Sequence, residues 1–198
     1  MAKRRRRRIK YEFKPDIQGK SLLQKLHLTQ FQQQKLLKWS LYSLLILALL
    51  IVQDVIMSQL HIMGAVTDLV VSGILLISVM EDSENGSLFA LLSSSFYVFS
   101  GSAPGPYAIG YLTVFAMAAA IFRQLYWRRG FTSNVLCAAI AVVVYELAVF
   151  GTGIFLGLTY WGRIGVFLVT AFFGCVTLLP LYPVVRAIGK IGGEIWSE

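Results

Sequence analysis

The sequence predicts an all-α protein, a polytopic membrane helix bundle of about six transmembrane helices. Residues 1–38 carry 12 of the 18 Lys and Arg residues and two acids, a local charge of +10 (12 − 2), whereas residues 39–185 contain only four basic residues. Hydrophobic residues make up 57% of the chain and charged residues 14%, against about 25% charged residues in soluble domains. A soluble domain distributes charge over its whole surface. Confinement of charge to one arm and a few loops is typical of a membrane protein.

Six segments are candidates for membrane spans, since a crossing helix needs about 20 mostly apolar residues. Two of them are short, and we expect each of these to be tilted, lengthened into its loops, or partly re-entrant. Pro180 and Pro183 are expected to bend or end the last span, and the Gly- and Pro-rich segment 101–106 predicts a turn. In chain order the spans are 39–60, 65–80, 87–100, 106–122, 131–155 and 164–185.

The distribution of Lys and Arg predicts the orientation of these spans, because basic residues near span ends favour the cytoplasm. The arm 1–38, the loop 123–130 and the tail 186–198 should then share the inner side, with an even number of crossings between them. We therefore expect a basic cytoplasmic arm, a transmembrane domain at 39–185 and a cytoplasmic tail, with both termini inside. The acidic turn 81–86 would also face the cytoplasm. The first span lacks a cleavage-site pattern, so it is expected to be an uncleaved signal anchor.

The arm is predicted to contact lipid. Its charge run should stay disordered by self-repulsion. Anionic membrane lipid is the simplest partner, with a cytoplasmic protein as the alternative and no nucleic acid expected. Residues 21–38 mix Leu with Gln and Lys, so they can form an interfacial amphipathic helix. The run consists of Arg4, Arg5, Arg6, Arg7 and Arg8, with a lysine on either side.

Small residues mark where transmembrane helices are expected to approach closely, since lipid provides no hydrophobic drive for helix association. The candidate packing residues are Gly110, Ala116, Ala120, Ala141 and Gly174.

Three acids lie within or beside the apolar runs, namely Asp54, Asp68 and Glu146. At about 1.5 Å per residue all three fall in the outer half of their predicted spans. Intramembrane carboxylates usually face the bundle interior, a wet cavity or a partner. Either the three share one polar site, or each reaches interfacial water separately. Arg163 is the only basic residue predicted on that side. Our hypothesis is that it pairs with Glu146, with Asp54 and Asp68 as competing partners.

Motifs for familiar chemistry are absent from the sequence, so an enzyme is not expected. There is no phosphate-binding glycine loop, no His-Glu-x-x-His and no Gly-x-Ser-x-Gly. Cys137 and Cys175 lie inside apolar runs without a Cys-x-x-Cys pair, and we expect them to be small buried hydrophobes. His27 and His61 are predicted on opposite sides of the membrane. We expect neither a metal nor a cofactor.

The segment 63–158 resembles the rod-shape-determining protein MreD family. Thr67-Asp68-Leu69 enters an apolar run, where that family often has Pro-Asp-Leu. The turn 101–106 is followed by Tyr-Ala-Ile-Gly-Tyr-Leu at 107–112, similar to the family's glycine-rich turn and small-residue helix. The basic loop 123–130 and a helix containing Tyr-Glu then follow in the family's order.

This resemblance implies a non-enzymatic subunit of the cell-wall elongation machinery in the bacterial cytoplasmic membrane. Members of the family work with the bitopic protein MreC, and through it with the filament MreB, the glycosyltransferase RodA and a class B penicillin-binding transpeptidase. The resemblance also implies a bundle similar to the substrate-binding components of energy-coupling-factor vitamin transporters. Such a component is the alternative function. Against it, the first span lacks an Ala-x-x-x-Ala face, and the predicted outer loops are short.

Overall fold

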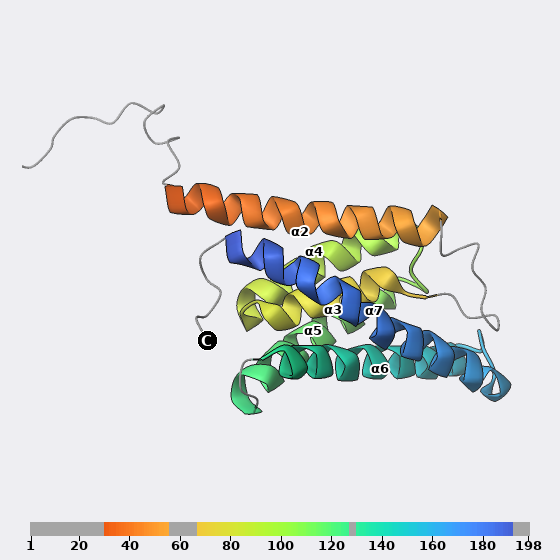
Figure 1. Cartoon of the computed structure of the whole chain (residues 1–198). Helices are drawn as coiled ribbons and strands as arrows, with labels where there is room; N and C mark the ends of the chain where they lie inside the picture. The colour runs from red at the N-terminus through yellow and green to blue at the C-terminus, as the bar shows by residue number, and fades with distance from the viewer. Residues whose placement is uncertain (1–29, 56–66, 127–129, 192–198) are drawn as a thin grey trace, which may run out of the picture.

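The chain folds as a bundle of antiparallel helices. The computed structural model describes residues 30–55, 67–126 and 130–191. Consecutive helices run in alternate directions, so α2 begins and α7 finishes at one end of the bundle, here called the terminal end (Figure 1). The opposite end, where α2 finishes and α7 begins, is the far end. The elements are α2 (Gln30–Val55), α3 (Leu69–Met80), α4 (Ser83–Phe99), α5 (Tyr107–Tyr126), α6 (Phe131–Phe155), the 3-10 turn η2 (Trp161–Arg163) and α7 (Ile164–Ile191).

The length and surface of the helices identify a membrane bundle. Among the described residues, four helical segments are long and apolar enough to cross a membrane: Gln32–Val55, Tyr107–Leu125, Phe131–Phe155 and Trp161–Ile191. Large hydrophobic side chains such as Leu44 are exposed on the outer surface. Water would make so much exposed apolar surface an aggregation hazard, whereas lipid solvates it. The predicted all-α membrane bundle is thus confirmed in its general form.

Helix α3 forms the centre of the bundle. Every residue from Leu69 to Val79 is buried, and α3 packs against α2, α4, α5, α6 and α7. A helix that is apolar on all sides is expected to be buried. Its 12 residues extend for about 18 Å, less than the hydrocarbon thickness of about 30 Å. The short second segment is therefore a core helix enclosed by longer neighbours.

Two helices continue through the domain boundaries predicted from sequence. Helix α2 begins at Gln30 and passes the boundary at 38/39 without a break, and α7 passes the boundary at 185/186. Helix α7 contains both Pro180 and Pro183 and reaches Ile191. Of the two predicted effects of these prolines, a bend or an end of the helix, the end does not occur. Proline is tolerated in membrane helices because neighbouring groups satisfy the freed carbonyls. The charge run 4–8 lies outside the described residues.

The candidate packing residues differ in their positions. Ala116, Ala120 and Ala141 are buried. Gly174 is also buried, where α7 approaches α3 and α6, and the Ser72 hydroxyl donates a hydrogen bond to its carbonyl at 3.0 Å. Gly110 is exposed, and a Cβ placed there would meet nothing within 4 Å. The prediction of close packing at Gly110 is therefore wrong for this bundle.

Helices α3 and α4 form a tight hairpin that depends on Gly86. Only Glu81 and Asp82 separate the two helices. The Ser78 hydroxyl donates a hydrogen bond to the Gly86 carbonyl at 3.0 Å. A Cβ at Gly86 would lie 2.7 Å from the Ser78 carbonyl oxygen, and that oxygen belongs to the backbone, so it cannot move aside as a flexible side chain would. The absence of a side chain at Gly86 permits this approach.

We expect Gly86→Ala to lower the free energy of unfolding by about 1–3 kcal/mol, the usual range for overpacking. Thermal unfolding of the purified protein in detergent measures the loss. Gly110→Ala is the matched control. It removes a glycine from an exposed helical position and should leave stability unchanged or raise it by up to about 1 kcal/mol. Equal losses at the two positions would contradict the close approach at Gly86.

Candidate functional site

A buried ion pair lies at the terminal end of the bundle. The Lys38 ammonium contacts the Glu81 carboxylate at 2.7 Å, and the Tyr42 hydroxyl donates to its other oxygen at 2.8 Å. Lys38 and Glu81 are only 3% and 8% exposed. Arg123 donates to the main-chain oxygen of Glu81 at 3.3 Å and to the Asn134 side-chain oxygen at 3.5 Å. This cluster joins α2, α3, α5 and α6.

Glu81 differs in burial from the other acids of the turn 81–86. Asp82 and Glu84 are exposed, but Glu81 is buried. Glu81 directly follows α3, which the other helices enclose. A buried carboxylate is costly unless it is paired. Lys38, on the longer helix α2, provides the compensating charge.

A second polar cluster lies at the far end, where α3 begins. The carboxylate of Asp68 accepts hydrogen bonds from the Tyr97 hydroxyl at 2.8 and 2.9 Å and from the Gln53 amide at 2.9 Å. The Gln53 side-chain oxygen accepts from the Val70 backbone N–H at 3.1 Å. That N–H belongs to the first turn of α3, where backbone donors have no partner within the helix. Side chains of α2 and α4 thus provide hydrogen-bond partners for the polar groups at the start of α3.

Helix α2 contacts α3 at both of its ends. At about 1.5 Å per residue, Lys38 and Gln53 are about 22 Å apart along α2, and Asp68 and Glu81 are about 20 Å apart along the chain of α3. The two spacings are similar, so the single helix α2 can donate hydrogen bonds to the carboxylates at both ends of α3. These polar contacts therefore help to hold the short helix α3 among its longer neighbours.

A cavity of about 260 Å³ adjoins the far-end cluster. Carboxyl and hydroxyl groups form part of its wall, and aliphatic and aromatic side chains form the rest. The polar lining residues are Asp68, Ser102, Tyr145, Glu146 and Thr170, and the others are Pro104, Val149, Val166 and Phe167.

The structure brings together some of the predicted outer residues. Asp68 and Glu146 line the same cavity. Asp54 is exposed at the end of α2, and its carboxylate accepts a hydrogen bond at 2.6 Å from Ser102, which lines the cavity too. Arg163 is exposed, with its guanidinium 5.5 Å from the centre of the Tyr160 ring. Within the described residues Arg163 forms no ion pair with Glu146, so the predicted pairing is wrong.

Two buried groups of the cavity wall have no partner in the described part of the chain. Glu146 is 5% exposed, and its carboxylate forms neither a hydrogen bond nor an ion pair there. Tyr145 is 1% exposed, and its hydroxyl has no hydrogen-bond partner there.

Gln53, Tyr97 and Tyr145 were not predicted from the sequence as members of the site. For Gln53 a signal was present, because a glutamine inside an apolar run indicates a polar contact within the bundle.

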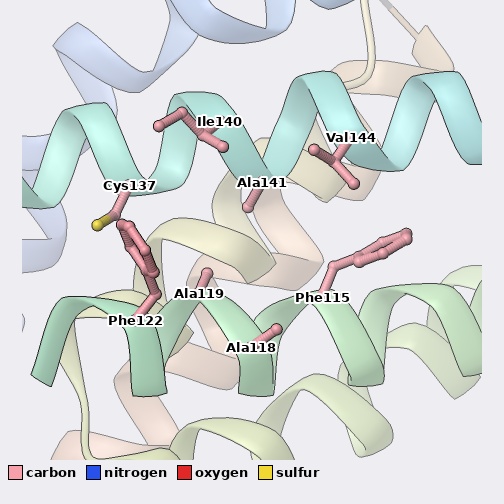
Figure 2. Close-up of a pocket in the computed structure, with 8 residues that line it drawn as sticks. All are labelled: Phe115, Ala118, Ala119, Phe122, Cys137, Ile140, Ala141 and Val144. Atoms are coloured by element: carbon pink, nitrogen blue, oxygen red, sulfur yellow. The ribbon is translucent and has the colours of Figure 1, made fainter. Parts of the chain in front are cut away.

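A separate, apolar groove lies on the side of the bundle between α5 and α6 (Figure 2). It encloses about 220 Å³. Phe122, Ile140 and Val144 are each about half exposed, so the groove opens toward lipid. Figure 2 shows its small residues between the two phenylalanines of α5. Its lining residues are Phe115, Ala118, Ala119 and Phe122 from α5, and Cys137, Ile140, Ala141 and Val144 from α6.

Within the described residues, no group of three or more His, Cys, Asp and Glu side chains is placed to hold a metal ion. Comparison of the chain with protein-family models, curated proteins and solved structures yields no significant match.

Proposed function

We propose that this chain is a non-enzymatic integral membrane subunit of the bacterial cell-wall elongation machinery, as the resemblance of 63–158 to the MreD family implies. The lateral groove between α5 and α6 is the observation that supports it most directly. A membrane scaffold needs an apolar surface that fits a partner helix more closely than it fits lipid. Alanines such as Ala118 and Ala119 let helix backbones approach, and Phe115 and Phe122 bound the space (Figure 2).

The proposed occupant of the groove is one transmembrane helix of a bitopic partner, which the resemblance identifies as MreC. Other wall-synthesis proteins would join through that partner. The arginine run 4–8 would contact anionic lipid of the inner leaflet. No cofactor enters this proposal.

The proposal places the chain in the bacterial cytoplasmic membrane with six crossings and both termini in the cytoplasm. The alternating helix directions support this arrangement (Figure 1), as does the Lys and Arg distribution. In a variant lacking Cys137 and Cys175, a cysteine at position 103 should react with an impermeant thiol reagent in intact cells. A cysteine at position 126 should react only after the membrane is opened. The reverse pattern would overturn the orientation.

The scaffold proposal is tested at Ala118, which is exposed in the groove. A photo-crosslinking amino acid at Ala118 should capture MreC in native membranes. The same group at Leu44, which is 65% exposed on α2, should not. Ala118→Leu should reduce co-purified MreC several-fold without lowering thermal stability, because its side chain points away from the core. Ala116 and Ala120 are unsuitable sites, since they are buried and larger residues there would disrupt the fold.

The far-end cavity favours one alternative, the substrate-binding component of an energy-coupling-factor vitamin transporter. Asp68 and Glu146 line a space open to a small molecule, as such a component requires. Affinity isolation separates the two functions. Recovery of MreC and wall synthases supports the scaffold, and recovery of paired ATPases supports the transporter component.

A further inference from the structure

We propose that the far-end cavity binds a small amphiphilic organic cation, a compound that carries a protonated amine on a short apolar group. The site goes beyond the proposed scaffold function, and either proposal can fail without the other.

The charge of the ligand follows from Glu146. Its carboxylate is almost fully buried on α6 and lacks a hydrogen-bond donor or a cation within the described residues. An intramembrane carboxylate is expected to face a partner or a wet cavity, and Glu146 lines the cavity. Arg163, the nearest candidate in the sequence, stacks over Tyr160 instead. No described residue pairs with Glu146, and a donor on a bound ligand would satisfy its carboxylate.

Asp68 strengthens the preference for a cation. Gln53 and Tyr97 already hydrogen-bond its carboxylate and fix it at the cavity wall. Two carboxylates facing one small space repel an anionic ligand and attract a cation. Tyr145 lines the same cavity, and its buried hydroxyl, without a hydrogen-bond partner in the described part of the chain, would provide an additional acceptor. An ammonium group has three N–H donors and no acceptor, which suits this set of oxygens.

The apolar part of the ligand follows from the rest of the wall. Val149, Val166 and Phe167 line the cavity together with the hydroxyl and carboxyl groups. A volume of about 260 Å³ is far larger than a single metal ion needs, and the described residues contain no cluster of three metal-ligating side chains. The volume lies just below the usual range for organic-ligand pockets, about 300–1,000 Å³. A small amine with one aliphatic or aromatic group fits both the volume and the lining.

Access is from the far end. Ser102 and Pro104 belong to the loop between α4 and α5 and line the cavity. Pro104 is exposed and Ser102 is partly exposed. The ligand would enter past this loop with its apolar group toward Phe167 and its ammonium toward Glu146.

A matched pair of probes tests the proposal on the purified full-length chain in detergent. 2-Phenylethylamine is protonated at neutral pH, whereas 2-phenylethanol has nearly the same shape and no charge. The amine should raise the melting temperature in a concentration-dependent way and give saturable binding by calorimetry. The alcohol should bind at least about tenfold more weakly, because it lacks the charge-assisted hydrogen bond to Glu146.

Three variants locate the site. Glu146→Gln keeps the side-chain size and should weaken amine binding by about tenfold or more. Tyr145→Phe removes only the hydroxyl and should weaken amine binding less than Glu146→Gln does. This second variant keeps the test valid if Glu146→Gln does not fold. Glu84→Gln, an exposed acid at the terminal end, should bind as the unaltered chain does. Equal binding of amine and alcohol, no binding of the amine, or amine binding unaffected by Glu146→Gln and Tyr145→Phe would overturn the proposal.

Discussion

Lys38→Met is expected to lower the free energy of unfolding by about 3–5 kcal/mol, the usual loss when one member of a buried ion pair is removed. The substitution leaves the Glu81 carboxylate buried at the end of α3, and among the described side chains only the Tyr42 hydroxyl still donates to it. Glu81 is almost fully buried, so water does not replace the lost ammonium group. Thermal or denaturant unfolding of the purified protein in detergent measures the change.

The double variant Lys38→Met, Glu81→Leu distinguishes an ion pair from a general packing effect. It removes both charges, so it should recover a large part of the stability lost by Lys38→Met alone, as replacement of buried pairs by apolar residues commonly does. Glu84→Gln is the control for loss of an exposed acid in the same hairpin. Strictly additive losses in the double variant would show that Lys38 and Glu81 do not interact energetically.

The long helices were predictable from hydropathy because their signal is carried by many residues at once. The predicted spans 131–155 and 106–122 correspond closely to α6 and α5. Hydropathy does not distinguish a helix facing lipid from one enclosed by other helices, because both are apolar all round. It therefore identified α3 as a short crossing and gave no indication that α3 is the central helix.

The polar contacts were less predictable because they join residues far apart in the sequence. Asp68 and Glu146 were recognised as costly carboxylates, and they do line one cavity. The partners of Asp68 come from α2 and α4, and only the packing of both helices on α3 places them there. Lys38 was assigned to the basic cytoplasmic arm, at the end of a possible interfacial helix, because it ends a basic segment. Its burial depends on α2 continuing past that boundary.

Asp68→Ala is expected to lower the free energy of unfolding by about 2–6 kcal/mol, the usual cost of leaving two buried donors unsatisfied. It leaves the buried donors of Tyr97 and Gln53 without their acceptor, and each orphaned donor costs about 1–3 kcal/mol. Asp68 precedes α3 but makes no side-chain capping hydrogen bond, so lost capping does not explain the effect. Asp54→Ala, an exposed acid at the same end, should cost much less.

The effect of Asp68→Ala should depend on Tyr97. Tyr97→Phe removes the hydroxyl that donates to both carboxylate oxygens at 2.8 and 2.9 Å. The double variant should therefore be less destabilised than the sum of the two single variants, since no tyrosine donor remains to be orphaned. Asp68→Asn retains one side-chain oxygen as acceptor and should fall between the unaltered chain and Asp68→Ala. Unfolding in detergent measures all four variants. If Asp68→Ala cost no more than Asp54→Ala, the far-end cluster would contribute little to the stability of the bundle. The packing of the apolar surface of α3 would then have to hold this helix in place.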